Sequence, residues 1–132
     1  MNSTLPVSYI VTALIQLTPD TTLFTLQSDQ ITTAASFLPG QFIELSLPGV
    51  GEIPISYCGR SSTDGVVELC IRHVGHVTSA LRGLAAGSVL AVRGPFGRGF
   101  PLELYSGKNL LLIAGGIGIA PLRALLLDLC LN

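Results

Sequence analysis

Turn-forming residues divide the first 106 residues of this chain into short, strand-length segments. The chain contains 15 Gly and 8 Pro with no repeat period, a distribution that excludes collagen-like and low-complexity sequence. The segments between the turns are rich in β-branched residues and are too short for most helices. The pattern therefore predicts a β-rich domain in which helix is the minority element.

Six segments have the pattern of strands. The first two flank the turn signal Pro19-Asp20 and are expected to pair in antiparallel. In the fifth, Val67, Leu69 and Ile71 alternate with more polar residues, as one buried face of a strand requires. We expect the strands at Tyr9–Leu17, Thr22–Leu26, Gln41–Leu47, Ile53–Cys58, Val66–His73 and Ser88–Gly94.

A short helix is predicted between the fifth and sixth strands, from Thr78 to Gly83. Thr78 is the expected N-cap, because a threonine hydroxyl can accept a hydrogen bond from an amide of the first turn. Six strands with one short helix predict a mainly β fold, a six-stranded antiparallel Greek-key barrel.

The character of the sequence changes after Ser106-Gly107. Asn109–Ala114 is a continuous apolar run, typical of a parallel strand covered on both faces, and a helix is predicted at Ala120–Leu131. Residues 1–106 are therefore expected to form the barrel, and residues 107–132 to begin an α/β nucleotide-binding domain. We expect that second domain to be truncated, about 100 residues short of its usual size.

Charge and cysteine content exclude several classes of protein. Seven basic against eight acidic residues give a net charge of -1, unlike a nucleic-acid-binding protein. Cys58, Cys70 and Cys130 contain no C-x-x-C pair, so we expect buried thiols rather than disulfides or a metal site. The N-terminus has no signal-peptide pattern, and Gly, Pro and charged residues interrupt the apolar stretch Leu110–Leu131. These features predict a cytoplasmic protein with no membrane span.

The segment from Arg72 to Thr78 could bind an anion. A strand end passes here into a helix start, and a guanidinium and a hydroxyl lie close to the first-turn amides. A capped helix beside a solvated arginine is an equally good interpretation. His73 and His76 lack carboxylate or cysteine partners in the sequence, and we expect them to be exposed loop histidines.

Three other segments could line a site. Ala114–Pro121 has the strand, Gly-rich turn and helix order of a dinucleotide-phosphate turn. Gly51–Ser56 contains Pro54, which marks a strand edge or bulge where a flat ligand could lie, although an ordinary strand entry has the same pattern. Arg93–Pro101 combines Gly, Arg and Phe, as either a pocket or a tight barrel-end loop would.

Taken in order, five motifs resemble the ferredoxin–NADP reductase superfamily. The resemblance is closest to the gamma-type diaphorase subunits of sulfhydrogenases and anaerobic sulfite reductases, and the electron-transfer subunits of dihydroorotate dehydrogenase are similar. The motifs are Phe37-Leu38-Pro39-Gly40-Gln41-Phe42, Pro54-Ile55-Ser56, Gly75-His76-Val77-Thr78, Arg93-Gly94-Pro95-Phe96-Gly97 and Gly115-Gly116-Ile117-Gly118-Ile119-Ala120-Pro121.

The resemblance implies an FAD-binding barrel followed by an NAD(P)-binding domain. It further implies a flavoprotein that passes electrons between NAD(P)H and an iron–sulfur or other redox partner subunit. The residues that it implies for FAD are Ile53, Pro54, Ile55, Ser56, Cys70, Ile71, Arg72, Val77 and Thr78. Those that it implies for the nicotinamide nucleotide are Gly115, Gly116, Gly118 and Pro121, with Arg93–Gly97 nearby.

Two positions depart from the pattern of many relatives. Ile55 stands where they have a tyrosine that stacks on the flavin, and Ile53 where they have an arginine that meets the pyrophosphate. Arg72 and the helix amides are therefore expected to carry more of the phosphate charge.

We expect this chain to be the FAD-binding module of an electron-transfer oxidoreductase. We also expect the chain on its own to be unable to react with NAD(P)H. A non-catalytic barrel that serves as an interaction or assembly domain, with a vestigial cofactor site, is the alternative, and Ile53 favours it. The apolar C-terminal unit is expected to self-associate or bind a partner.

Overall fold

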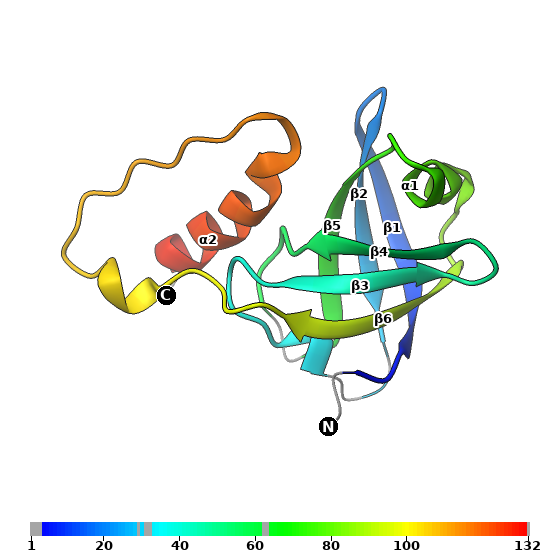
Figure 1. Cartoon of the computed structure of the whole chain (residues 1–132), viewed down its shortest axis with the longest axis horizontal. Coiled ribbons are helices and arrows are strands. Elements are labelled where there is room, and N and C mark those ends of the chain that lie inside the picture. The colour runs from blue at the N-terminus through cyan, green and yellow to red at the C-terminus, as the bar shows by residue number, and fades with distance from the viewer. Residues whose placement is uncertain (1–3, 29, 31–32, 62–63, 132) are drawn as a thin grey trace.

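The six predicted strands form one antiparallel sheet, in the order β4-β3-β6-β1-β2-β5 (Figure 1). This computed structural model describes residues 4–28, 30, 33–61 and 64–131. The strands are β1 (Val7–Thr18), β2 (Thr21–Gln27), β3 (Phe42–Leu47), β4 (Gly51–Ser56), β5 (Val66–Arg72) and β6 (Val89–Phe96). The mainly β fold is confirmed, and the predicted strand bounds shift by a few residues, most at β4.

The sheet curls until its two edge strands approach one another. They meet at a single bridge between Tyr57 and Leu69, and beside it the backbone N–H of Cys58 donates to the carbonyl of Glu68 at 3.2 Å. No ladder joins the described residues of β4 and β5 beyond this point. The barrel is thus closed at one end of this seam and open along the rest.

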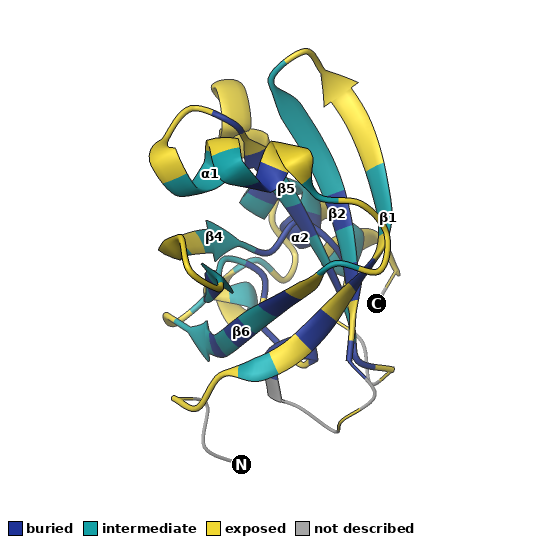
Figure 2. Ribbon diagram, turned by 90° about the vertical axis from the view of Figure 1, so that its right-hand side faces the viewer, coloured by how far each residue is buried: buried dark blue, intermediate teal, exposed yellow. Residues whose placement is uncertain are grey.

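Alternating burial along the strands builds the core of the barrel (Figure 2). Val67, Leu69 and Ile71 are fully buried, as the sequence pattern predicted. Tyr57 is also fully buried, and its ring stacks on that of Phe37 with 3.7 Å between centroids. The other fully buried large side chains are Tyr9, Val11, Phe24, Leu26, Ile43, Leu45, Leu81 and Leu90.

The helix after β5 starts earlier than predicted. Helix α1 spans His76–Ala80 and continues as a 3-10 turn over Leu81–Gly83. Gly75 is its N-cap, so the prediction of Thr78 at that position is wrong. The Thr78 hydroxyl instead reaches back and accepts hydrogen bonds from the backbone N–H groups of Gly75 at 2.8 Å and Val74 at 3.1 Å. A threonine in the third helical position stabilises the helix start by this reciprocal contact.

His73 is buried, contrary to the prediction of an exposed loop residue. Its Nδ1 donates to the carbonyl of Thr78 at 2.6 Å, and its Nε2 lies 2.9 Å from the hydroxyl of Thr22. The position continues the inward alternation of β5 by one more step, which explains its burial.

The C-terminal region confirms the predicted helix and not the predicted strand. Helix α2 spans Ile119–Leu131, but residues 108–115 form neither strand nor helix, so the strand expected at Asn109–Ala114 is wrong. Leu111 is 85% exposed and Ile113 79% exposed. A strand requires a neighbouring strand for its backbone hydrogen bonds, and no described strand lies beside this segment.

Two other expectations concern the cysteines and the membrane. Cys58 is buried and Cys70 half-buried, whereas Cys130 is exposed on α2, so its predicted burial is wrong. Among the residues that the structure describes, no helix has the length and apolar character needed to cross a lipid bilayer.

Candidate functional site

A groove of about 380 Å³ lies where β4 and β5 separate. One wall comes from β4, the second from the end of β5, and the third from the start of α2 and the turn before it. In that order, its lining residues are Pro54, Ile55 and Ser56; Cys70, Ile71, Arg72 and Val74; and Ile117, Gly118, Ala120 and Pro121.

The sequence explains why the seam stays open here. Pro54 has no backbone N–H and cannot extend a ladder across to β5. At the start of β4, Gly51 lies against α1, and a Cβ there would approach a methyl group of Val77 to 2.9 Å. The free edge of β4 therefore begins beside α1 and ends at the bridge that closes the seam.

A second pocket, of about 410 Å³, adjoins the groove. The two share Cys70, Arg72 and Ile117, so Arg72 stands at their junction. Arg72 is the one cationic side chain among the described residues that line either pocket. The remaining lining residues of the second pocket are Leu17, Thr18, Asp20, Thr21, Gly116 and Ile119.

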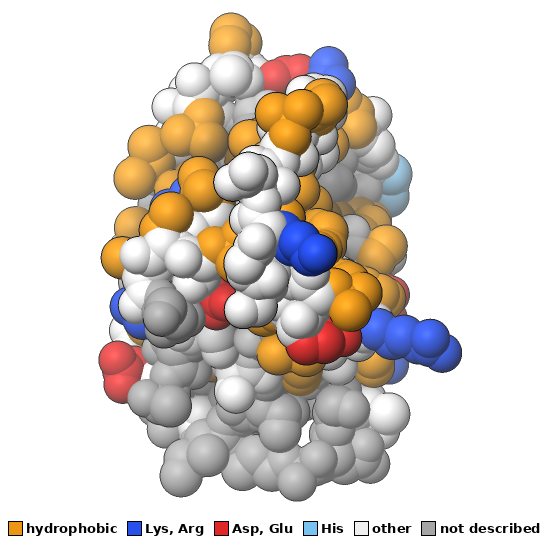
Figure 3. Space-filling model, turned by 90° about the vertical axis from the view of Figure 1, so that its left-hand side faces the viewer, with side chains coloured by type: hydrophobic (Ala, Val, Ile, Leu, Met, Phe, Trp, Pro, Cys, Tyr) orange, Lys and Arg blue, Asp and Glu red, His pale blue; other side chains and the backbone are white. Residues whose placement is uncertain are grey.

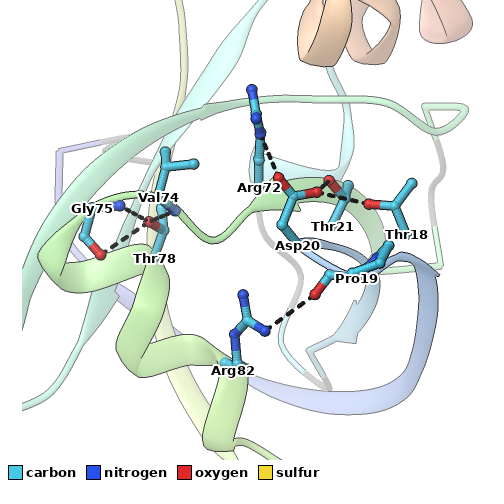
Figure 4. A network of polar contacts seen from close by, with 9 residues as sticks. All are labelled: Thr18, Pro19, Asp20, Thr21, Arg72, Val74, Gly75, Thr78 and Arg82. Carbon is cyan, nitrogen blue, oxygen red and sulfur yellow. Dashed lines mark hydrogen bonds and ion pairs between the residues drawn. The ribbon is translucent and has the colours of Figure 1, made fainter.

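Asp20, in the β1–β2 turn, holds Arg72 in place (Figure 4). The Arg72 Nε donates to its carboxylate at 2.8 Å, and the hydroxyls of Thr18 and Thr21 donate to the other carboxylate oxygen at 2.8 and 3.1 Å. The backbone N–H of His73 donates to the Asp20 carbonyl at 2.7 Å. The Arg72 hydrogen bond, followed by those of the two threonines, lowers the pKa of Asp20 to about 2.

The terminal nitrogens of Arg72 point away from Asp20 in Figure 4. The Asp20 carboxylate accepts from Nε alone, so the two terminal NH2 groups of Arg72 remain oriented for another acceptor. Asp20 thus fixes the direction of Arg72 and also neutralises its charge.

The structure brings most of the predicted site residues together. Those that line the groove are Pro54, Ile55, Ser56, Cys70, Ile71, Arg72, Gly118 and Pro121. Gly116 lines the adjoining pocket, whereas Gly115 lines neither. Val77 and Thr78 lie on α1 at the other end of β4.

Ile53 is not in the groove. Its side chain is half-buried and packs against the hydrophobic core. Sequence reasoning missed three lining residues, Val74, Ile117 and Ala120, although they stand inside or beside the motifs singled out. It also missed Asp20, which the sequence indicates only as part of a turn. Asp20 is distant from Arg72 in sequence, so no local pattern links the two residues.

Arg93 is engaged elsewhere on the barrel. Its Nε donates to Glu52 at 3.1 Å and its Nη2 to the other carboxylate oxygen, which joins β6 to β4 across β3. The Arg93 hydrogen bond lowers the pKa of Glu52. Arg93 lines neither pocket.

The thiols near the groove are protonated at neutral pH. Burial raises the pKa of Cys58 to about 12, and burial also raises that of Cys70. A thiol is a poor nucleophile in this state. The groove therefore offers a ligand apolar walls, one serine hydroxyl and one guanidinium.

Comparison with solved structures defines the class of this fold. The chain is similar to the Amycolatopsis cytochrome P450 reductase GcoB, with a TM-score of 0.80 and 30% identity over 94% of this chain and 38% of that one. It is also similar to the ferredoxin reductase in carbazole 1,9a-dioxygenase, with a TM-score of 0.63 and 31% identity over 70% of this chain and 29% of that one. The barrel is thus of the ferredoxin-reductase type.

The family follows from the sequence comparison. Residues 8–100 match the model of the oxidoreductase FAD-binding domain, and the chain belongs to this family. Sulfhydrogenase 1 subunit gamma of Pyrococcus furiosus is 47% identical, over 80% of this chain and 36% of that protein. A probable dihydroorotate dehydrogenase B (NAD(+)) electron transfer subunit from the same organism is 39% identical, over 76% of this chain and 37% of that protein. The chain spans less than two fifths of the length of either relative.

Proposed function

We propose that this chain binds FAD in the groove between β4 and β5 and is the flavin module of an electron-transfer oxidoreductase. The observation that carries the proposal is the open seam, whose volume falls in the range of small-molecule sites. Pro54 and Ile55 offer apolar surface to a flat ring system, and Ser56 offers a hydroxyl. Arg72 supplies a positive group where the groove meets the second pocket.

The residues divide between the two ends of the cofactor. Pro54–Ser56 and Cys70–Ile71 would contact the ring system, and Arg72 with Val77 and Thr78 would hold the pyrophosphate. Ile53 faces the core, so the phosphate charge falls to Arg72. When bound, FAD supplies a redox centre that exchanges electrons in pairs or singly.

The redox partner and the source of electrons are proposed for the whole protein, since this chain spans only part of the length of its relatives. Relatives named as a sulfhydrogenase gamma subunit and as an electron transfer subunit support a role between NAD(P)H and a redox partner subunit, of iron–sulfur or hydrogenase type. The turn and helix start that contain Gly115, Gly116, Gly118 and Pro121 would bind the pyridine nucleotide. We infer that these residues do not suffice for reaction with NAD(P)H, and that the protein works in the cytoplasm.

The exposed apolar C-terminal unit supports a contact with another surface. Leu111 and Ile113 are largely exposed, and α2 adds exposed leucines at positions 126, 129 and 131. Figure 3 shows hydrophobic side chains spread over the face that this unit contributes to. Burial of such surface is favourable, so we expect self-association or a partner there.

A non-catalytic assembly domain is the second candidate, because Ile53 contributes to the core and offers no charge. A flavin titration separates the two. The purified chain should change FAD fluorescence with 1:1 stoichiometry and stay yellow after unbound FAD is removed. A colourless chain after incubation with excess FAD and removal of the unbound flavin would favour the assembly domain.

A pair of tryptophan substitutions locates the site. Cys70→Trp places a large ring where the two pockets meet and should abolish FAD binding. Leu104→Trp adds the same ring at a side chain that is 64% exposed and lines neither pocket, so binding should be unchanged. Equal affinity in both variants would place the flavin elsewhere.

A further inference from the structure

One side chain ties the C-terminal helix to the barrel. Arg123 of α2 donates from Nη1 to the backbone carbonyl of Cys58 at 2.6 Å and to Oε2 of Glu68 at 3.2 Å. The Arg123 side chain is 43% exposed and that of Glu68 is 29% exposed, so water only partly screens the pair. The guanidinium joins α2 to two barrel residues that lie more than 50 positions earlier in the chain.

Both acceptors lie at the closed end of the seam. Cys58 and Glu68 are themselves joined by a backbone hydrogen bond, beside the bridge that links β4 to β5. The Glu68 side chain packs on Gly59, where an added Cβ would lie 2.7 Å from the Glu68 Cβ. Arg123 therefore bonds to a hydrogen-bonded and closely packed part of the barrel, next to the strand residues that form two walls of the groove.

The third wall depends on the placement of α2. Ile117, Gly118 and Pro121 line the groove and come just before Arg123 in the chain. The preceding segment, residues 108–115, has no regular structure and exposed side chains, so it restrains the wall only weakly. The buried side chains of Ala120, Ala124 and Leu125 hold α2 against the barrel by apolar contact, which is not directional. The two charge-assisted hydrogen bonds of Arg123 are directional and fix how the helix lies.

We propose that Arg123 is a positioning residue for the flavin groove, which holds the Ile117–Pro121 wall in place through Cys58 and Glu68. The proposal rests on the proposed FAD site, but it concerns the wall and not the phosphate contacts. Loss of Arg123 should therefore weaken FAD and riboflavin equally, by about three- to tenfold, the effect of losing about one hydrogen bond.

The first measurement needs no flavin. Hydrogen exchange of the α2 amides is compared in the full chain and three variants: Arg123→Met, Arg123→Lys and Lys108→Met. The methionine variant should exchange faster, and lysine, with one charged donor, should restore part of the protection. Lys108→Met removes the same charge from the exposed segment and should match the parent chain.

The second measurement follows bound flavin. In Arg123→Met, iodide should quench bound FAD more strongly than in the parent chain, because the wall no longer covers the groove. Arg123→Lys should give intermediate quenching and affinity, a rescue that general destabilisation of the barrel does not predict.

Three outcomes would overturn the proposal. Unchanged α2 exchange in Arg123→Met would show that Arg123 does not hold the helix. Faster exchange with unchanged affinity and quenching would show that the wall is irrelevant to the flavin. A loss confined to FAD, with riboflavin unaffected, would assign Arg123 to the phosphates. If the parent chain binds no flavin, the proposed function fails, and the exchange data alone decide whether Arg123 holds α2.

Discussion

Replacement of Arg72 with methionine should weaken FAD binding and leave riboflavin binding unchanged. Methionine keeps an unbranched side chain of similar reach and removes the only cationic group among the described lining residues of the two pockets. Riboflavin has the same ring system as FAD and no phosphate. The difference between the two ligands therefore isolates the phosphate contact that we assign to Arg72.

The magnitude follows from the exposure of the side chain. A charge-assisted hydrogen bond contributes about 1.5–3 kcal/mol, but the Arg72 side chain is 52% exposed, so solvent screening reduces the contribution to about 1–2 kcal/mol. A loss of about 1–2 kcal/mol corresponds to about a five- to thirtyfold increase in the Kd of FAD.

The assay is a fluorescence titration with FAD, FMN and riboflavin. Arg82→Met is the matched control, because Arg82 also contacts the β1–β2 turn, through the Pro19 carbonyl at 3.1 Å, and lines neither pocket (Figure 4). It should bind all three flavins like the parent chain. Equal losses for FAD and riboflavin in Arg72→Met, or no loss for either, would refute the assignment.

Three further predictions concern stability and association. The Asp20 carboxylate has a lowered pKa, about 2 in the folded chain, so its stabilising contacts are complete above about pH 4 and lost as the pH falls through 2. The Tm of Asp20→Asn should therefore lie below that of the parent at pH 7, and the two should converge near pH 2; a constant difference would contradict this. Gly87 has φ +94° and open space where an added Cβ would lie, so Gly87→Ala should cost about 1–2 kcal/mol in denaturant unfolding. Gly65→Ala should cost more, because its Cβ would also lie 2.5 Å from a neighbouring backbone carbonyl oxygen, and a cost no larger than at Gly87 would count against the packing described. Leu111→Gln should reduce the apparent mass in light scattering if the exposed segment self-associates, and an equally large species in both chains would exclude this residue from the contact.

Local pattern predicted the barrel because each strand carries its own signal. The Pro19-Asp20 turn predicted β1, β2 and their antiparallel pairing, and the alternation predicted β5. The pairing of β5 with β2 had no local signal. The prediction of a strand at Asn109–Ala114 was wrong because it rested on apolar composition alone. The backbone of a strand also needs a neighbouring strand for its hydrogen bonds, and no described strand lies beside this segment.

The sequence predicted most residues of the site but not the hydrogen bonds that link them. Motif residues of β4 and β5, which the resemblance implied for FAD, line one groove. Gly118 and Pro121, which it implied for the pyridine nucleotide, line the same groove. The contacts of Asp20 with Arg72 and of Arg123 with Glu68 join residues more than 50 positions apart. Such pairs leave no periodic signal in one sequence, because their distance is set by how the sheet curls.

The location of the positive charge determines how this groove can favour a diphosphate. The Ile53 side chain packs against the core, so the positive charge comes from Arg72 on β5, across the groove from β4. Asp20 is ionised at neutral pH and already compensates that charge. A diphosphate therefore meets a pair with no net charge, and directed hydrogen bonds from the terminal nitrogens must supply the attraction. Because salt screens net charge more than short hydrogen bonds, FAD affinity here should depend only weakly on ionic strength.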